Sequence, residues 1–188
     1  MRTKYYSRKL TSTLTAIVAL IAMMGLHQSS FAQETGSTNK ARVGIYDSRA
    51  IAVAFAGSAS FKDWLGDLRA KHEKAKASGD QKQAAELEAE GASRQKLMHM
   101  QGFSTAPVTN LLELIKDKLP AINEKAGVSV LVSKWDKAGL ARYKDADHVD
   151  VTMALVDAFS PSERQRKTAI DIQKHEPIPL EQAEQIKD

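Results

Sequence analysis

Large apolar side chains are spread unevenly along this sequence, and their spacing predicts its architecture. Val43 and Ile45 alternate with other residue types, which is the period of a half-buried strand at 42–47. A second strand is predicted at 128–133, where β-branched residues are dense enough for the centre of a sheet. A short run at 140–143 predicts a third strand, which a turn would join to the second.

The stretch at 66–96 cannot form a globular core, because Leu68 and Leu87 are its only apolar side chains larger than alanine. It is rich in Ala, Glu, Lys, Gln and Arg, so we expect helices that are almost wholly solvated. Such helices usually lie against each other, which predicts an antiparallel helical hairpin. Gly79 can end the first arm in the left-handed conformation and form the tip. A tip near Gly102 would make the first arm twice as long and stays open as an alternative.

Apolar residues return where the two arms begin and end, at a spacing that suits one face of each helix. A further amphipathic helix is predicted at 108–122, bent at Pro120 and closed by Gly127, so the helical arms span about 58–126. The apolar residues at the base of the arms are Phe61, Trp64, Leu65, Leu68, Leu97, Met98, Met100 and Phe103.

These elements predict an α+β fold. A small β-sheet head would carry the protruding antiparallel helical hairpin and a short C-terminal helix, which Asp147 or Asp150 can cap. The residues at 160–188 are mostly polar, and we expect a helix followed by an extended tail.

The first residues predict an exported protein. A basic segment without an acidic residue precedes a short apolar run at 14–26, and Ser30 and Ala32 are the small residues of a cleavage site. The apolar run is shorter than the roughly 20 residues that span a membrane, so permanent anchoring is the weaker interpretation. We expect a signal peptide at 1–32, cleavage after Ala32, a flexible linker at 33–40 and no transmembrane segment in the mature chain.

Charge and cysteine content exclude several classes of function. The chain has 27 basic and 23 acidic residues, and four of the basic residues lie in the leader, so the mature protein is neutral. Net charge therefore gives no reason to expect nucleic acid as a partner. The absence of cysteine excludes disulfides, zinc-thiolate sites, thiol nucleophiles and a lipid-modified cysteine. No phosphate-binding loop or hydrolase motif is present, so we do not expect an enzyme of these common classes.

Two short motifs carry candidate chemistry, and both favour a structural interpretation. Asp47 and Ser48 follow the first strand, where active sites often begin, but a side chain that caps the next helix is the simpler interpretation. Met98, His99 and Met100 offer ligands that favour Cu(I). On a helix the two methionines would point to different faces, so packing at the hairpin base is expected instead.

The order of these elements resembles that of the Skp/OmpH family of periplasmic chaperones. The likeness is strongest at 108–159, where Asp150-Val151-Thr152 is similar to the Asp-aliphatic-Thr signature of the family. The segment at 42–48 resembles the first strand of the family. By this resemblance the family-like domain spans 41–159, and the tail at 160–188 is an addition.

The resemblance implies an ATP-independent periplasmic holdase without a cofactor. The sheets of three subunits would form a head, and the helical arms would surround unfolded outer-membrane proteins. Shorter arms and a neutral mature charge distinguish this chain from the family. The alternative is a non-catalytic envelope interaction or scaffold protein with an OmpH-like fold. The expected client-binding residues are Phe61, Trp64, Leu65, Leu68, Leu97, Met98 and Phe103.

Overall fold

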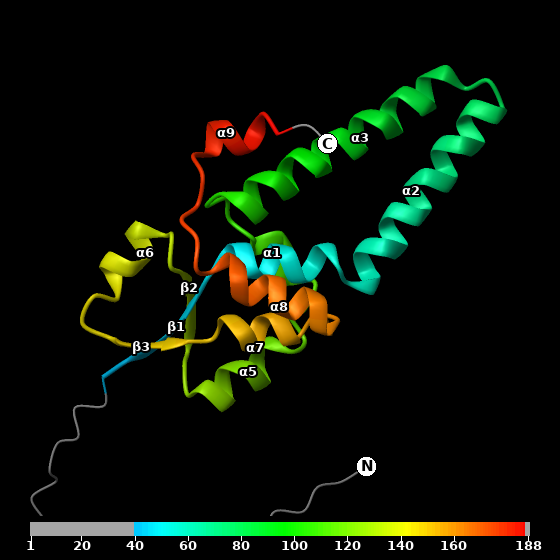
Figure 1. Ribbon diagram of the computed structural model, residues 1–188. Coiled ribbons are helices and arrows are strands. Elements are labelled where there is room, and N and C mark those ends of the chain that lie inside the picture. The colour runs from blue at the N-terminus through cyan, green and yellow to red at the C-terminus, as the bar shows by residue number, and fades with distance from the viewer. Residues whose placement is uncertain (1–39, 187–188) are drawn as a thin grey trace, which may run out of the picture. The chain divides into compact units, whose positions relative to one another are not determined.

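A small sheet lies at one end of the described part of the chain, which comprises residues 40–186 of a computed structural model (Figure 1). The central strand has one neighbour on each side, and both pairs are parallel, so Val43 lies opposite Val130 and His148. The strands are β1 (Arg42–Tyr46), β2 (Val130–Ser133) and β3 (Asp147–Asp150).

The predicted fold class is wrong about the sheet head, both in the arrangement of its strands and in the residues that form the third strand. Of the residues that the structure describes, 62% are helical, and the sheet among them has three parallel strands. Residues 140–143, predicted to be the third strand, belong instead to α6 (Lys137–Arg142). The third strand is β3, which begins at Asp147, a residue expected to cap a helix.

The parallel arrangement explains why a helix replaces the predicted strand. β2 and β3 lie on opposite sides of β1, and parallel strands need a crossover of about a dozen residues, which is usually a helix. A tight turn would have joined only antiparallel neighbours. The side chain of Asp136 starts α6 by accepting a hydrogen bond from the backbone N–H of Gly139 at 2.9 Å.

Two long helices, α2 (Ala59–Ala77) and α3 (Gln81–Phe103), form the hairpin at the upper right of Figure 1. Gly79 forms the tip with a left-handed φ of 74°, and the Asp80 carboxylate caps α3 by accepting a backbone N–H. Of the two tips left open by the sequence, the structure therefore has the first. The second is excluded because α3 continues through Gly102.

The two arms meet along a narrow line of small and medium side chains, which we call the arm seam. Leu68 and Ala75 are the buried residues of α2, and their separation of seven positions is typical of a coiled coil. A Cβ atom added to Gly91 would lie 3.4 Å from Cδ2 of Leu68, so the two helices approach closely there. The remaining arm surface is mostly exposed and charged. By burial and spacing, the arm seam consists of Leu68, Ala75, Ala84, Leu87 and Gly91.

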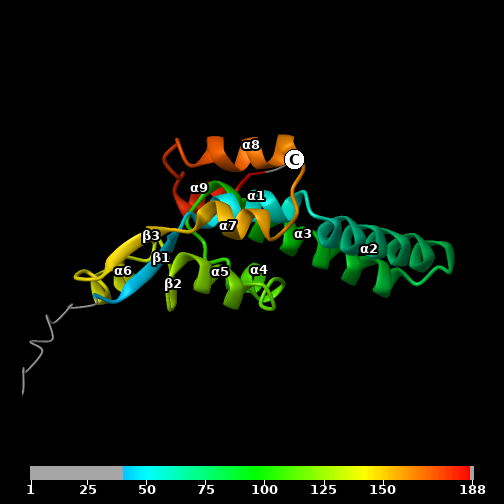
Figure 2. The same ribbon diagram turned by 90° about the horizontal axis from the view of Figure 1, so that it is seen from below.

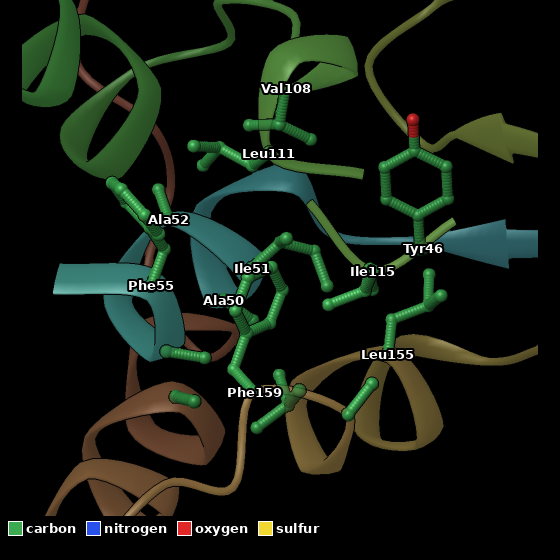
Figure 3. Packing of buried hydrophobic residues seen from close by; sticks show 14 of the residues in the cluster. Tyr46, Ala50, Ile51, Ala52, Phe55, Val108, Leu111, Ile115, Leu155 and Phe159 are labelled. Atoms are coloured by element: carbon green, nitrogen blue, oxygen red, sulfur yellow. The ribbon is translucent and has the colours of Figure 1, made fainter. Parts of the chain in front are cut away.

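The hydrophobic core surrounds α1 (Ser48–Ala56), which packs against α3, α7 (Thr152–Asp157) and α8 (Glu163–Ile172). Figure 2 shows α1 between α8 on one side and the helices that follow the hairpin on the other. Several buried side chains converge on α1 in Figure 3, and the labelled ones include Ile51, Phe55, Val108, Leu111, Ile115, Leu155 and Phe159.

The long amphipathic helix predicted at 108–122 is interrupted. The segment contains two short helices, α4 (Thr109–Glu113) and α5 (Leu119–Ala126), with turns between them. Pro120 lies in the first turn of α5, where its missing N–H costs no helical hydrogen bond. Gly127 ends α5 with a left-handed φ of 64°, which confirms its predicted role.

The C-terminal segment folds back onto the returning arm. Ser162 and Gln165 form a capping box that starts α8. Beyond it, α9 (Leu180–Glu184) packs against α3. The backbone N–H of Ile178 donates to the carbonyl of Phe103 at 3.0 Å. The segment expected to be an extended tail is thus attached to the hairpin base as far as the structure describes it.

The predicted signal peptide at 1–32 lies outside the described residues, as does the linker up to residue 39. In the described range, 40–186, none of the helices has both the length and the apolar character needed to cross a membrane.

Candidate functional site

A pocket of about 360 Å³ opens between α2 and α3 at the base of the hairpin. Part of the predicted client-binding set lines it: Phe61, Trp64 and Leu65 from α2, and Met98 from α3. All four side chains are partly exposed, so they can contact a bound molecule. The volume lies within the range of about 300–1,000 Å³ that is usual for ligand sites. The structure therefore joins these residues into one concave apolar surface.

The other predicted residues lie elsewhere. Leu68 is buried in the arm seam against Gly91, which leaves it little surface for a client. Leu97 and Phe103 do not line the pocket. Phe103 is 45% exposed, and its ring lies 5.8 Å from that of His99. The predicted set is thus divided between the pocket, the arm seam and the end of α3.

A row of aromatic rings connects the pocket to the hydrophobic core. The ring centroids of Trp64 and Phe61 are 5.8 Å apart, and Phe61 lies 5.5 Å from Phe55 in α1. Phe55 in turn lies 6.2 Å from Phe159, and both of its contacts are edge-on, as aromatic pairs prefer. This aromatic row attaches the base of α2 to the core and holds Trp64 in place.

Two arginines give the pocket a local positive charge. Arg69 comes from α2 and Arg94 from α3, and within the described chain no acidic side chain lines the pocket. The guanidinium of Arg94 lies 4.9 Å from the centroid of the Trp64 ring, a cation–π arrangement. Across residues 40–186, neither arginine takes part in a direct ion pair.

Neither arginine was among the predicted site residues, although their spacing carried a usable signal. Arg69 follows Leu65 by four positions and Arg94 precedes Met98 by four, so each shares a helix face with a predicted residue. The spacing within each helix does not predict the register between α2 and α3. It is this register that brings the two faces together.

A second polar group lies where the strands end. The carboxylate of Asp47 is 1% exposed and pairs at 2.9 Å with the guanidinium of Arg49, which is fully buried. Lys134 approaches the same carboxylate at 2.7 Å, and the indole N–H of Trp135 donates to it at 3.2 Å. The burial of the charged Arg49 side chain was not predicted, because arginine is almost never fully buried unless it is paired.

The hydrogen bonds to Asp47 determine its protonation. Burial raises the pKa of its carboxyl, but hydrogen bonds from Arg49, Lys134 and Trp135 together lower the pKa below its ordinary value. The carboxylate is therefore ionised at neutral pH and fully engaged with donors, which suits a structural role better than that of a general base. Its side chain also accepts the backbone N–H of Arg49, which confirms the predicted helix cap.

The Asp150-Val151-Thr152 motif fastens the end of β3 to the end of β1. The hydroxyl oxygen of Thr152 accepts the backbone N–H of Asp47 at 3.0 Å, and Asp150 accepts the backbone N–H of Thr152 at 2.8 Å. Val151 is buried beside Gly44 of the central strand. The motif thus has a structural role in the sheet and does not contribute to the pocket.

No family model, curated protein or solved structure matches this chain. The resemblance to the Skp/OmpH family therefore stays a prediction.

Proposed function

We propose that this protein is a periplasmic, ATP-independent holdase that binds unfolded outer-membrane proteins at the base of its helical arms. The observation that carries the proposal is the concave apolar surface formed by Phe61, Trp64, Leu65 and Met98 between two otherwise charged helices. Concave apolar surface that stays open to solvent is typical of a site for a partner. The pocket is open to an extended chain because it lies between protruding helices.

The chemistry of the lining suits many weak contacts. Met98 has a flexible, polarisable side chain that adapts to different partners. Trp64 and Phe61 supply large contact areas at a small cost in conformational entropy. Such a surface favours passive holding of varied apolar segments, for which no nucleotide is needed.

The direct test is suppression of aggregation. A chemically unfolded β-barrel outer-membrane protein is diluted into buffer with the mature chain at a one-to-one ratio, and light scattering is followed. We expect less scattering with the wild type and a clear loss of protection with Trp64→Ala combined with Met98→Ala. Leu114→Ala is the matched control, because it removes a large apolar side chain that is exposed outside the pocket. Undiminished aggregation with the wild type would contradict the proposal.

The proposal includes assembly of three subunits, which multi-angle light scattering of the mature protein tests. A monomer would favour the alternative of an envelope scaffold protein. That alternative gives the C-terminal tail the binding role, and the packing of α9 against α3 leaves less of the tail available for it.

A further inference from the structure

On the basis of that holdase function, we infer that the hairpin-base pocket selects client segments in which a carboxylate neighbours a large apolar side chain. The client is thus assigned a chemical class, that of acidic and apolar unfolded segments. The inference depends on the charge of the pocket lining as well as on its apolar surface.

The apolar part of the pocket accepts the side chain. Trp64 lies between Phe61 and the guanidinium of Arg94, so its ring is held in one place by contacts from both arms. Leu65 and Met98 complete the apolar lining. A volume of about 360 Å³ is suited to a few residues of an extended chain rather than to a folded partner.

The charged part of the pocket accepts the carboxylate. Arg69 and Arg94 stand on opposite walls, one on each arm, without ion-pair partners in the described chain. A guanidinium presents planar donors that match the two oxygens of a carboxylate. Arg94 is partly buried, which strengthens its interaction with an anion relative to bulk water.

This local charge is not apparent from the neutral mature sequence. Acidic and basic residues balance over the whole chain, but the pocket lining contains arginine and, in the described range, no aspartate or glutamate. A client segment carrying lysine beside its apolar residue should be repelled by the arginines. A segment carrying glutamine there should still bind, but the arginines should add nothing to its affinity. The pocket can thus discriminate by charge as well as by hydrophobicity.

Peptide binding tests the inference directly. Three dye-labelled, unstructured peptides would differ at one central position, Leu-Glu-Phe, Leu-Gln-Phe or Leu-Lys-Phe, and fluorescence anisotropy would give their affinities for the mature protein. We expect the Glu peptide to bind about fivefold to tenfold more tightly than the Gln peptide at low salt, and the Lys peptide to bind most weakly. The preference should shrink in high salt, because the pocket is open to solvent.

Substitution of the two arginines tests whether they cause the preference for the Glu peptide. Arg69→Gln combined with Arg94→Gln should lower the affinity for the Glu peptide to about that for the Gln peptide. Arg142→Gln is the matched control, because Arg142 is exposed on α6 and should leave all three affinities unchanged. Circular dichroism of each variant verifies that it is folded.

The outcomes separate the inference from the function on which it depends. Equal binding of the Glu and Gln peptides, or a preference that survives loss of both arginines, would overturn the selectivity even if aggregation is still suppressed. If no peptide binds while aggregation is suppressed, clients bind elsewhere and the pocket assignment is overturned. Failure of both assays would overturn the holdase function itself.

Discussion

Replacement of Asp47 by Asn tests how much the buried ion pair at the strand ends contributes to stability. Asp47 is 1% exposed and the side chain of Arg49 is fully buried, and two donor atoms of Arg49 contact the carboxylate at 3.2 and 2.9 Å. Asparagine has nearly the same shape and keeps one oxygen acceptor. The substitution therefore removes the negative charge and leaves the guanidinium buried without a counter-charge.

The expected loss is large. Removal of one partner from a buried ion pair costs about 3–5 kcal/mol in the free energy of unfolding. Lys134 adds little to this loss, because its side chain is about one-third exposed and can turn towards solvent. Each kcal/mol lowers Tm by about 2–4 °C in a protein of this size, so Tm should fall by about 6–20 °C. Replacement of Arg49 by Met in the same chain should recover part of the loss, because no buried charge then remains.

The effect should also depend on pH. Because the folded state lowers the pKa of Asp47 below its unfolded value, its charge stabilises the protein fully above roughly pH 4. That contribution is lost as the pH falls through the folded pKa, so the stability difference between wild type and Asp47→Asn should shrink in acid. Urea unfolding followed by circular dichroism at neutral and acidic pH measures both quantities. A difference below about 1 kcal/mol at pH 7, or one that does not change with pH, would refute the ion-pair reasoning.

Two further substitutions test the sheet and the arms. Thr152→Val removes the acceptor of the buried Asp47 N–H and should cost about 1–3 kcal/mol in urea unfolding, whereas Thr152→Ser keeps the hydroxyl and should lose less. An equal loss in both would indicate that the methyl group, and not the hydrogen bond, matters. Gly66→Ala in the exposed middle of α2 meets no neighbouring atom within 4 Å and should stabilise the protein by up to about 1 kcal/mol. A lower Tm in that variant would contradict the inference that this part of α2 is exposed to solvent.

The sequence predicted those elements whose signals are local. The tip at Gly79 could be predicted, because a left-handed glycine followed by the capping residue Asp80 needs no distant partner. The strand β3 could not be predicted, because the segment at 147–150 has few strand-forming residues. It becomes a strand by pairing with β1, which lies about a hundred positions earlier in the sequence. Likewise Asp136 offered a local cap for α6, but the run Leu140-Ala141-Arg142-Tyr143 was predicted to be a short strand.

The candidate site shows the same division. Helical spacing identified the apolar residues at the base of each arm, because those patterns are periodic within one helix. It did not reveal which of them meet across the hairpin, and so Leu68 and Phe103 were grouped with the pocket residues. The opposed positions of Arg69 and Arg94 depend on the register between α2 and α3, which only the packing of the arm seam determines.

The arm seam also sets how stability is distributed along the hairpin. Towards the tip the arm seam contains only small side chains, the buried Ala75 and the partly buried Ala84, and each of them removes little apolar surface from water. At the base, the aromatic row ties α2 to the core. Local unfolding should therefore begin at the tip, at a free energy well below that of global unfolding. The distal half of the hairpin can then open and close while the walls of the pocket at its base keep their geometry.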